Sequence, residues 1–212
     1  CLPIIGFIPS SAASPNEIMP TEIEAQYRLA DPAGMRHRLT ACGAAFEGAV
    51  LESNRLYDWP DGRLARADRA LRVRRAEPTT GPPAHRPTGA AVVTVTGKGP
   101  RRPGAMKVRD EREFHADDAE AVAAVLGALG MDRTLLFEKR RATWTLDDCT
   151  VVLDEVPHLG HFMEIEGPAE DAVMDLARQL RLDDEDVVTD TYSHLLAAHC
   201  RAHDLDDSTI TF

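Results

Sequence analysis

The chain has 212 residues, 43% of them hydrophobic, which is enough for one domain with a substantial core. Its formal net charge of -11 and its aromatic content of only 5% argue against binding to nucleic acids, and the acidic balance also argues against anionic membranes. The four cysteines are widely spaced, with neither a C-x-x-C zinc pattern nor a disulfide framework, so a cytoplasmic location is expected.

Residues 1–18 are predicted to be a poorly ordered extension. The apolar run 2–8 is too short to span a bilayer and lacks the basic flank of a secretory signal. The strong pattern begins only at Thr21, so we interpret Met19 as the start of the folded domain. This domain is predicted to cover residues 19–200, followed by an acidic tail over 201–212.

Strand patterns dominate the first two thirds of the domain. The predicted strands cover residues 22–29, 50–58, 70–75, 91–98, 106–114, 135–146, 150–156 and 162–166. Eight strands are enough to close a small barrel around side chains or one ligand. We therefore predict an α+β fold in which a closed eight-stranded antiparallel β-barrel is flanked by helices.

Helices are predicted between some of these strands. Asp31 and Pro32 form a capping pair that opens the first helix, and residues 117–130 form the second. Pro168 opens a third helix, and residues 192–199 suggest a short last one. The segment 77–89, rich in proline and glycine, is predicted to be a long loop rather than a domain linker.

Like charges stand two residues apart in several predicted strands. Glu164 and Glu166 flank Ile165, just as Arg72 and Arg74 flank Val73. Because strand side chains alternate between faces, each charged pair lies on one surface and the apolar residue lies on the other. For any single strand an ordinary solvated face explains this pattern, but its recurrence in strand after strand favours a shared polar interior.

The best-placed charged residues on this face number six of each sign. The cations are Arg72, Arg74, Lys98, Arg109, Lys139 and Arg141, and the carboxylates are Glu22, Glu24, Glu111, Asp154, Glu164 and Glu166. Buried ion pairs barely repay their desolvation, so a ligand is the better reason for this set. Carboxylates can hold Mg²⁺ or Mn²⁺, and guanidinium groups match phosphate oxygens, so the pattern indicates a metal-dependent triphosphate site.

These residues resemble the CYTH superfamily of triphosphate tunnel enzymes, whose motif on the first strand is E-x-E-x-K. The corresponding segment here is Glu22-Ile23-Glu24-Ala25-Gln26. The resemblance continues through the segments L-R-V-R-R at 71–75, G-K-G-P at 97–100, K-V-R-D-E-R-E at 107–113, K-R-R-A-T-W at 139–144, V-L-D-E-V-P-H-L-G-H-F-M-E-I-E at 152–166 and T-Y-S-H-L-L at 191–196. The G-K-G-P and T-Y-S-H-L-L segments look most like the class IV adenylate cyclase branch.

The resemblance implies a role for each residue. The metal carboxylates would be Glu22, Glu24, Glu164 and Glu166, with Glu111 and Asp154 supporting them. The triphosphate would be held by Gln26, Arg72, Arg74, Lys98, Arg109, Lys139 and Arg141, with Lys98 and Arg141 as the catalytic residues.

The resemblance also implies an activity, for which three alternatives stay open. The first is a cyclase that converts ATP to cyclic AMP and pyrophosphate with Mg²⁺ or Mn²⁺. The second is hydrolysis of thiamine triphosphate or tripolyphosphate, and the third is non-catalytic binding of a nucleotide or polyphosphate. Relatives in this branch are often dimers, so a homodimer is a further expectation.

Gln26 departs from the family pattern, which has lysine at this position. An amide can still donate a hydrogen bond to phosphate, but charge-assisted bonds are roughly twice as strong as neutral ones. We therefore expect either slow turnover or compensation by Lys139 or Lys107.

Overall fold

The computed structural model describes residues 21–80, 90–104 and 106–212, apart from the side chain of Glu22. The predicted extension over residues 1–18 and most of the predicted loop 77–89 lie outside the described residues.

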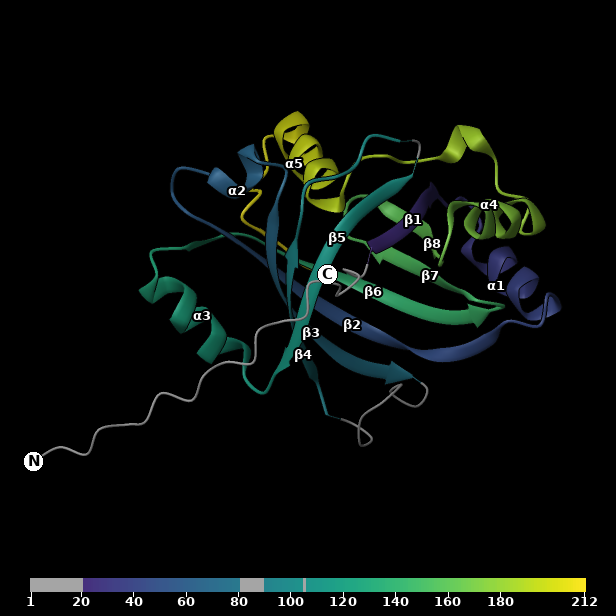
Figure 1. The fold of residues 1–212 in the computed structure, drawn as a ribbon, viewed down its shortest axis with the longest axis horizontal. Coiled ribbons are helices and arrows are strands. Elements are labelled where there is room, and N and C mark those ends of the chain that lie inside the picture. The colour runs from purple at the N-terminus through teal and green to yellow at the C-terminus, as the bar shows by residue number, and fades with distance from the viewer. Residues whose placement is uncertain (1–20, 81–89, 105) are drawn as a thin grey trace, which may run out of the picture.

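Eight antiparallel strands close into a barrel because β2 pairs with both β3 and β6 (Figure 1). Around the barrel the order is β2-β3-β4-β5-β1-β8-β7-β6. The strands are β1 Thr21–Arg28, β2 Ala45–Asp58, β3 Ala70–Thr80, β4 Val92–Lys98, β5 Lys107–Ala116, β6 Asp132–Leu146, β7 Cys149–Val156 and β8 Gly160–Glu166. The predicted closed eight-stranded barrel is confirmed.

Helices cover the outside of the barrel. They are α1 Pro32–Ala41, α2 Arg63–Arg66, α3 Ala119–Ala128, α4 Glu170–Gln179 and α5 Tyr192–His203, with a 3-10 turn over Asp184–Asp186. The Asp31 side chain caps α1 by accepting a hydrogen bond from the Gly34 N–H, as the sequence predicts. None of the described helices is long and apolar enough to cross a bilayer.

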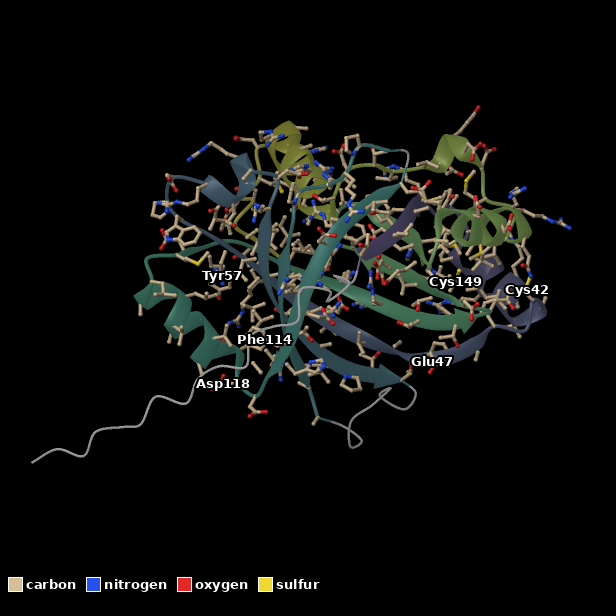
Figure 2. The ribbon with its side chains drawn as sticks, viewed as in Figure 1. Cys42, Glu47, Tyr57, Phe114, Asp118 and Cys149 are labelled. Atoms are coloured by element: carbon tan, nitrogen blue, oxygen red, sulfur yellow. The ribbon has the colours of Figure 1, made fainter. Side chains whose placement is uncertain are left out.

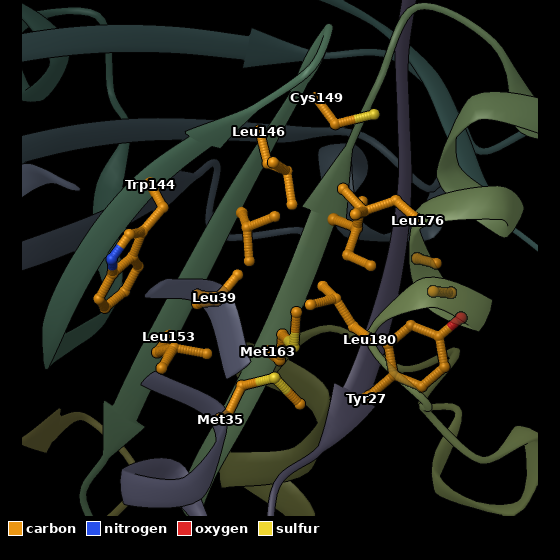
Figure 3. Close-up of a cluster of buried hydrophobic side chains, with 14 of the residues drawn as sticks. Tyr27, Met35, Leu39, Trp144, Leu146, Cys149, Leu153, Met163, Leu176 and Leu180 are labelled. Carbon is orange, nitrogen blue, oxygen red and sulfur yellow. The ribbon is translucent and has the colours of Figure 1, made fainter. Parts of the chain in front are cut away.

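The largest hydrophobic cluster lies between the outer face of the barrel and the pair α1 and α4 (Figure 3). Met35 and Leu39 stand four residues apart on α1 and are buried in this cluster, together with Tyr27 and Ile165 from the strands. Because this outer face is apolar and covered, the alternate side chains of the same strands must face the interior.

Two smaller clusters cover other parts of the barrel. Residues of α3 pack on Tyr57, Val73 and Val95, on the side opposite α1 and α4 in Figure 1. Leu196 of α5 packs with Phe137 and Phe162 in the second cluster. Since Phe137 shares the interior-facing parity of its strand, α5 covers one end of the barrel.

A short ninth strand, β9 Thr209–Ile210, pairs in parallel with β6 outside the closed barrel. Its Ile210 is buried in the same cluster as Leu196. The ring of Phe212 lies under the guanidinium of Arg140, 3.8 Å from its central carbon. The described end of the chain is therefore packed on the barrel.

Candidate functional site

The interior of the barrel holds two adjoining cavities of about 500 and 360 Å³. Strand alternation determines what lines them: Glu113 of β5 lines both, whereas the next residue, Phe114, is 61% exposed on the outside (Figure 2). Six residues line both cavities, namely Glu24, Arg74, Glu113, Arg141, Glu164 and Glu166. The polar face predicted from the sequence is thus the lumen.

Eleven of the thirteen site residues predicted from the sequence line the larger cavity. They are Glu24, Gln26, Arg72, Arg74, Lys98, Arg109, Glu111, Lys139, Arg141, Glu164 and Glu166. Asp154 is buried beside this cavity without lining it, and the side chain of Glu22 lies outside the described part of the chain. The eleven lining residues come from six strands, and Asp154 of β7 lies beside them, as the alternating pattern requires.

Arg141 of β6 lies at the centre of an ion-pair network. Its Nε and Nη2 donate to Asp154 Oδ1 and Oδ2 at 2.8 and 2.6 Å, and Nη2 also contacts Glu164. Although burial by itself lowers the pKa of Arg141, the charges of Asp154 and Glu164 raise it well above its ordinary value. Arg141 therefore stays charged in the lumen.

Glu52 of β2 is the acidic counterpart of this network and is only 2% exposed. It accepts from Lys139 and Arg74, each at 3.4 Å. Burial by itself raises the pKa of Glu52, but the charges of Lys139, Arg74 and Arg141 lower it far below its ordinary value. Burial likewise raises the pKa of Glu164, but the charges of Arg141 and Lys139 lower it below its ordinary value.

These two carboxyls predict that acid will destabilise the fold. A glutamate with a lowered folded-state pKa stabilises the protein above the ordinary pKa of about 4.3, and the stabilisation is lost as pH falls toward the lowered value. The free energy of unfolding, from urea titrations, should therefore fall by a few kcal/mol between about pH 5 and pH 2. The variant Glu52→Gln should be less stable at neutral pH and show a flatter dependence. If the unfolding free energies of the wild type and Glu52→Gln depend on pH in the same way, Glu52 is not a source of the acid sensitivity.

Asp154 orients the basic residues around it. Besides the two bonds from Arg141, its Oδ2 accepts from Lys139 Nζ and from the Tyr192 hydroxyl, both at 3.0 Å. Burial and the charge of Asp154 raise the pKa of Tyr192 well above its ordinary value, so this hydroxyl remains a donor. With its oxygens occupied in this way, Asp154 is placed to position Arg141 and Lys139.

Lys107 of β5 supplies a positive charge beside Gln26. Its Nζ contacts Gln26 Oε1 and lies 3.4 Å from Glu24 Oε1. The family has a lysine at the position of Gln26, and here the ammonium of Lys107 reaches the same part of the lumen from the neighbouring strand. Lys107 is one of the two residues that the sequence analysis names as able to compensate for Gln26.

The carboxylates of Glu24 and Glu166 are candidates for holding a divalent cation. The two residues are directly opposite each other in the β1–β8 register, and both line both cavities. Facing residues of an antiparallel pair have Cβ atoms about 5 Å apart, within reach of one ion. Among the described residues there is no group of three or more acids, histidines or cysteines arranged as a complete metal cage. The donor set therefore fits a cation such as Mg²⁺, which binds one or two carboxylates and takes its remaining ligands from water and substrate phosphates.

Three buried polar atoms that face this region have no hydrogen-bond partner among the described residues. They are Gln26 Nε2, Asn54 Oδ1 and Arg72 Nε. Burial and the neighbouring Arg74 also lower the pKa of Arg72. Buried polar groups are normally paired, and leaving one unpaired costs about 1–3 kcal/mol. Since all three residues line the larger cavity, these atoms indicate that it accommodates a ligand.

The sequence did not single out several lumen residues that matter here. The main ones are Glu52 and Asn54 of β2 and Tyr192 of α5, whereas Glu113 lies on the face of β5 that the sequence assigns to Arg109 and Glu111. Glu52 and Asn54 share one face of β2, but the polar residues Ser53 and Arg55 alternate with them, so the sequence pattern alone does not show which face is interior.

The sequence and fold match a known family and several of its relatives. The profile of the CYTH domain family matches residues 20–192, which contain all eight barrel strands. A Methanocaldococcus jannaschii protein provisionally named an adenylate cyclase is 22% identical over 183 residues, covering 82% of this chain and 97% of that protein. A solved structure from Pyrococcus horikoshii is 26% identical with a TM-score of 0.71, covering 84% of this chain and 98% of its own. A Hippeastrum protein, provisionally named an adenylyl cyclase and described as having a dominant triphosphatase activity, has a TM-score of 0.60 at 16% identity, covering 84% and 95%.

Proposed function

Because this chain belongs to the CYTH domain family, we propose that it is a metal-dependent enzyme that processes a triphosphate inside the barrel. The charge of the larger cavity is the observation that carries this proposal. Eight basic residues and five glutamates line it in a chain whose net charge is -11. The basic residues are Arg72, Arg74, Lys98, Arg101, Lys107, Arg109, Lys139 and Arg141.

The basic residues would bind the phosphate oxygens through charge-assisted hydrogen bonds. Arg72 and Arg74 lie on one wall of the lumen, and Lys139 and Arg141 lie on another, because β2 separates β3 from β6. Arg109 is paired with Asp68, whose Oδ1 lies 3.5 Å from its Nη2. Gln26 Nε2 would add a neutral donor, with its orientation fixed by the contact of Lys107 with Oε1.

Glu24 and Glu166 are the proposed carboxylate ligands of a divalent cation, with Glu22 and Glu164 beside them on the same strands. When bound, Mg²⁺ or Mn²⁺ would neutralise phosphate charge and help activate the attacking hydroxyl or water. Glu111 contacts Lys98, and Asp154 accepts a hydrogen bond from Arg141. We therefore propose that these two acids position the side chains of Lys98 and Arg141.

The first proposed reaction is adenylate cyclisation. The ribose 3′-hydroxyl would lose its proton to water as its oxygen forms a bond to the α-phosphorus, while the bond from that phosphorus to the bridging oxygen breaks and pyrophosphate leaves. Negative charge then grows on the departing phosphates. Lys98 and Arg141 line the cavity and are the proposed catalytic residues that would neutralise this charge.

Hydrolysis of a terminal phosphate is the second candidate. It is favoured by the triphosphatase activity described for the Hippeastrum protein, whose barrel this chain shares. Its substrates would be thiamine triphosphate or tripolyphosphate, and the same basic residues would hold the phosphates. Water would form a bond to the terminal phosphorus as the bond to the bridging oxygen breaks, which releases phosphate and the shortened diphosphate.

Product analysis tests the proposal directly. Purified protein would be incubated with Mn²⁺ or Mg²⁺ and either ATP, thiamine triphosphate or tripolyphosphate. Cyclic AMP with pyrophosphate would identify a cyclase, and free phosphate would identify a triphosphatase. Binding without any product would leave a nucleotide or polyphosphate binder, and neither product nor binding would overturn the proposal.

We predict that a lysine at position 26 of β1 can take over the role of Lys107. Lys107→Met removes a charge beside Gln26 and is expected to weaken tripolyphosphate binding about tenfold, because hydrogen bonds to charged groups contribute about 1.5–3 kcal/mol. The double variant Gln26→Lys with Lys107→Gln exchanges the two side chains and should recover most of the affinity in calorimetric titrations with Mg²⁺. A double variant that binds no more tightly than Lys107→Met would show that the ammonium is not acting at this position.

A further inference from the structure

Asp68 lies in the turn between α2 and β3, in a backbone conformation that residues other than glycine seldom adopt. Its φ of 50° is left-handed, and it follows Ala67 at the end of α2, where glycine is the usual residue. Holding another residue in this conformation costs free energy, and residues held in this way cluster at functional sites. The side chain of Asp68 is therefore a candidate for a functional role.

The carboxylate of Asp68 holds Arg101 by both its backbone and its side chain. Oδ2 accepts from the Arg101 N–H at 2.7 Å, and Oδ1 accepts from Arg101 Nε at 3.1 Å. Arg101 Nη1 also donates to the carbonyl oxygen of Thr189 at 3.5 Å, shortly before α5 begins. Because the backbone N–H fixes the carboxylate, Asp68 in turn fixes the direction of the Arg101 guanidinium, which lines the larger cavity.

Asp68 is also the counter-ion of Arg109, which is only 7% exposed. Asp68 Oδ1 lies 3.5 Å from Arg109 Nη2, and no other carboxylate of the described residues lies within ion-pair distance of Arg109. Burial by itself raises the pKa of Asp68, but the bonds from Arg101 and the charges of Arg101 and Arg109 lower it, so the carboxylate stays ionised. One carboxylate thus orders two guanidinium groups.

These two arginines lie toward one end of the lumen. Arg109 lines both the larger cavity and a cavity of about 250 Å³ beside α5, which Asp68 also lines. Arg74 and Arg141 line both lumen cavities, whereas neither Arg101 nor Arg109 lines the smaller one. The basic residues are therefore spread along the barrel, and Asp68 holds two of them at the end beside α5.

We propose that Asp68 is a positioning residue that presents Arg101 and Arg109 to the phosphates of the substrate. This inference rests on the proposed function and adds to it a carboxylate outside the charged set predicted from the sequence. Asp68 itself does not bind the substrate; it keeps two long side chains in one arrangement before the ligand binds. Ordering such side chains during binding lowers affinity, so arginines that are already ordered bind an anion more tightly.

Calorimetric titrations test this role. The ligand is an analogue of tripolyphosphate with methylene groups in place of the bridging oxygens, which prevents turnover in the presence of Mg²⁺. Asp68→Asn keeps an acceptor for the Arg101 N–H and tolerates the left-handed conformation, but it loses the charge. Asp68→Gly also suits this conformation and removes the side chain entirely. Both variants should bind the analogue about tenfold more weakly than the wild type.

Asp204→Asn is the matched control for the chemical change. Asp204 ends α5 with a φ of 53°, so the same replacement is made in the same backbone conformation. Asp204 lines neither lumen cavity nor the cavity beside α5, and its variant should bind the analogue as the wild type does.

A mutant cycle with Arg101→Met separates positioning from a merely structural role. If Asp68 acts through Arg101, the loss of affinity caused by Asp68→Asn should be clearly smaller in the Arg101→Met protein, because one of the two ordered arginines is already absent. Urea denaturation of each variant checks that the fold is kept. An equal loss with and without Arg101 would overturn the positioning role.

The remaining outcomes are equally decisive. Unchanged affinity in Asp68→Asn and Asp68→Gly would overturn the role, and so would tighter binding, which would show that Asp68 competes with phosphate for its arginines. Either result would leave the proposed function in place. Wild-type protein that does not bind the analogue would overturn the proposed function and the role of Asp68 together.

Discussion

Replacing Arg141 by methionine should cost about 3–5 kcal/mol of folding free energy and abolish measurable triphosphate binding. Arg141 pairs with Asp154 through two bonds and with Glu164, and it lies 4.0 Å from Glu52. Removing the guanidinium leaves these acids buried without their main counter-charge, which is the costly way to break a buried ion pair. It also removes the central cation of the lumen.

The neighbouring Arg140 provides a matched control. It points to the outside of the same strand, pairs with the exposed Glu155 and stacks on Phe212. Exposed pairs and cation–π contacts each contribute about 1 kcal/mol or less, so Arg140→Met should be only slightly destabilised and should bind tripolyphosphate normally. The comparison needs urea denaturation at neutral pH and a calorimetric titration of both variants. Equal losses of stability and affinity in the two would contradict the alternation on which the site is built.

Neutralising Glu24 or Glu166 is expected to abolish metal-dependent turnover while leaving the fold intact. The two carboxylates face each other across β1 and β8, and glutamine keeps their shape without the charge that a hard cation requires. Loss of residues that only support metal ligands typically costs about 10–100-fold, so loss of a ligand should cost at least about 100-fold in turnover and a similar factor in Mn²⁺ affinity.

Glu155→Gln removes a carboxylate that lies one strand away on the outer face and is the control for this pair. Turnover by Glu155→Gln should match the wild type. If Glu24→Gln and Glu166→Gln also keep wild-type turnover and Mn²⁺ affinity, the cation binds elsewhere.

The architecture was predictable because alternation survives in most strands. In β8, Ile165 is buried in the outer cluster while Glu164 and Glu166 line the lumen, as the sequence pattern indicates. The same rule places Arg72 and Arg74 inside and Val73 outside. A closed barrel converts such a local pattern into a shared interior, since every strand has one face toward the axis.

The pattern failed where the backbone or the outer face is irregular. The sequence predicts that this strand starts at residue 50, whereas β2 begins at Ala45. The register shifts near Gly48, whose φ is 141°, and this interrupts the alternation that would have revealed the first residues of the strand. Farther along β2, Ser53 and Arg55 put polar side chains on the outer face, so polarity no longer distinguishes the lumen side and Glu52 is obscured. β3 continues through Pro78, which is tolerated because pairing with β4 has ended at Ala76.

Contacts between strands could not be read from the sequence. Nothing in it shows that β1 lies beside β5, and so the contact of Lys107 with Gln26 appears only in the fold. The bond from the Tyr192 hydroxyl to Asp154 likewise joins residues from α5 and β7. β9 is a two-residue strand without any periodicity of its own. The homodimer and the cytoplasmic location stay predictions from the sequence.

A crystal structure with Mn²⁺ and a non-hydrolysable ATP analogue would test most directly whether the lumen is a metal-triphosphate site. The phosphates should lie inside the barrel against Arg72, Arg74 and Arg141, with an anomalous Mn²⁺ peak beside Glu24 and Glu166. Phosphates bound on the outer surface, with the barrel interior holding only water, would contradict the proposed site.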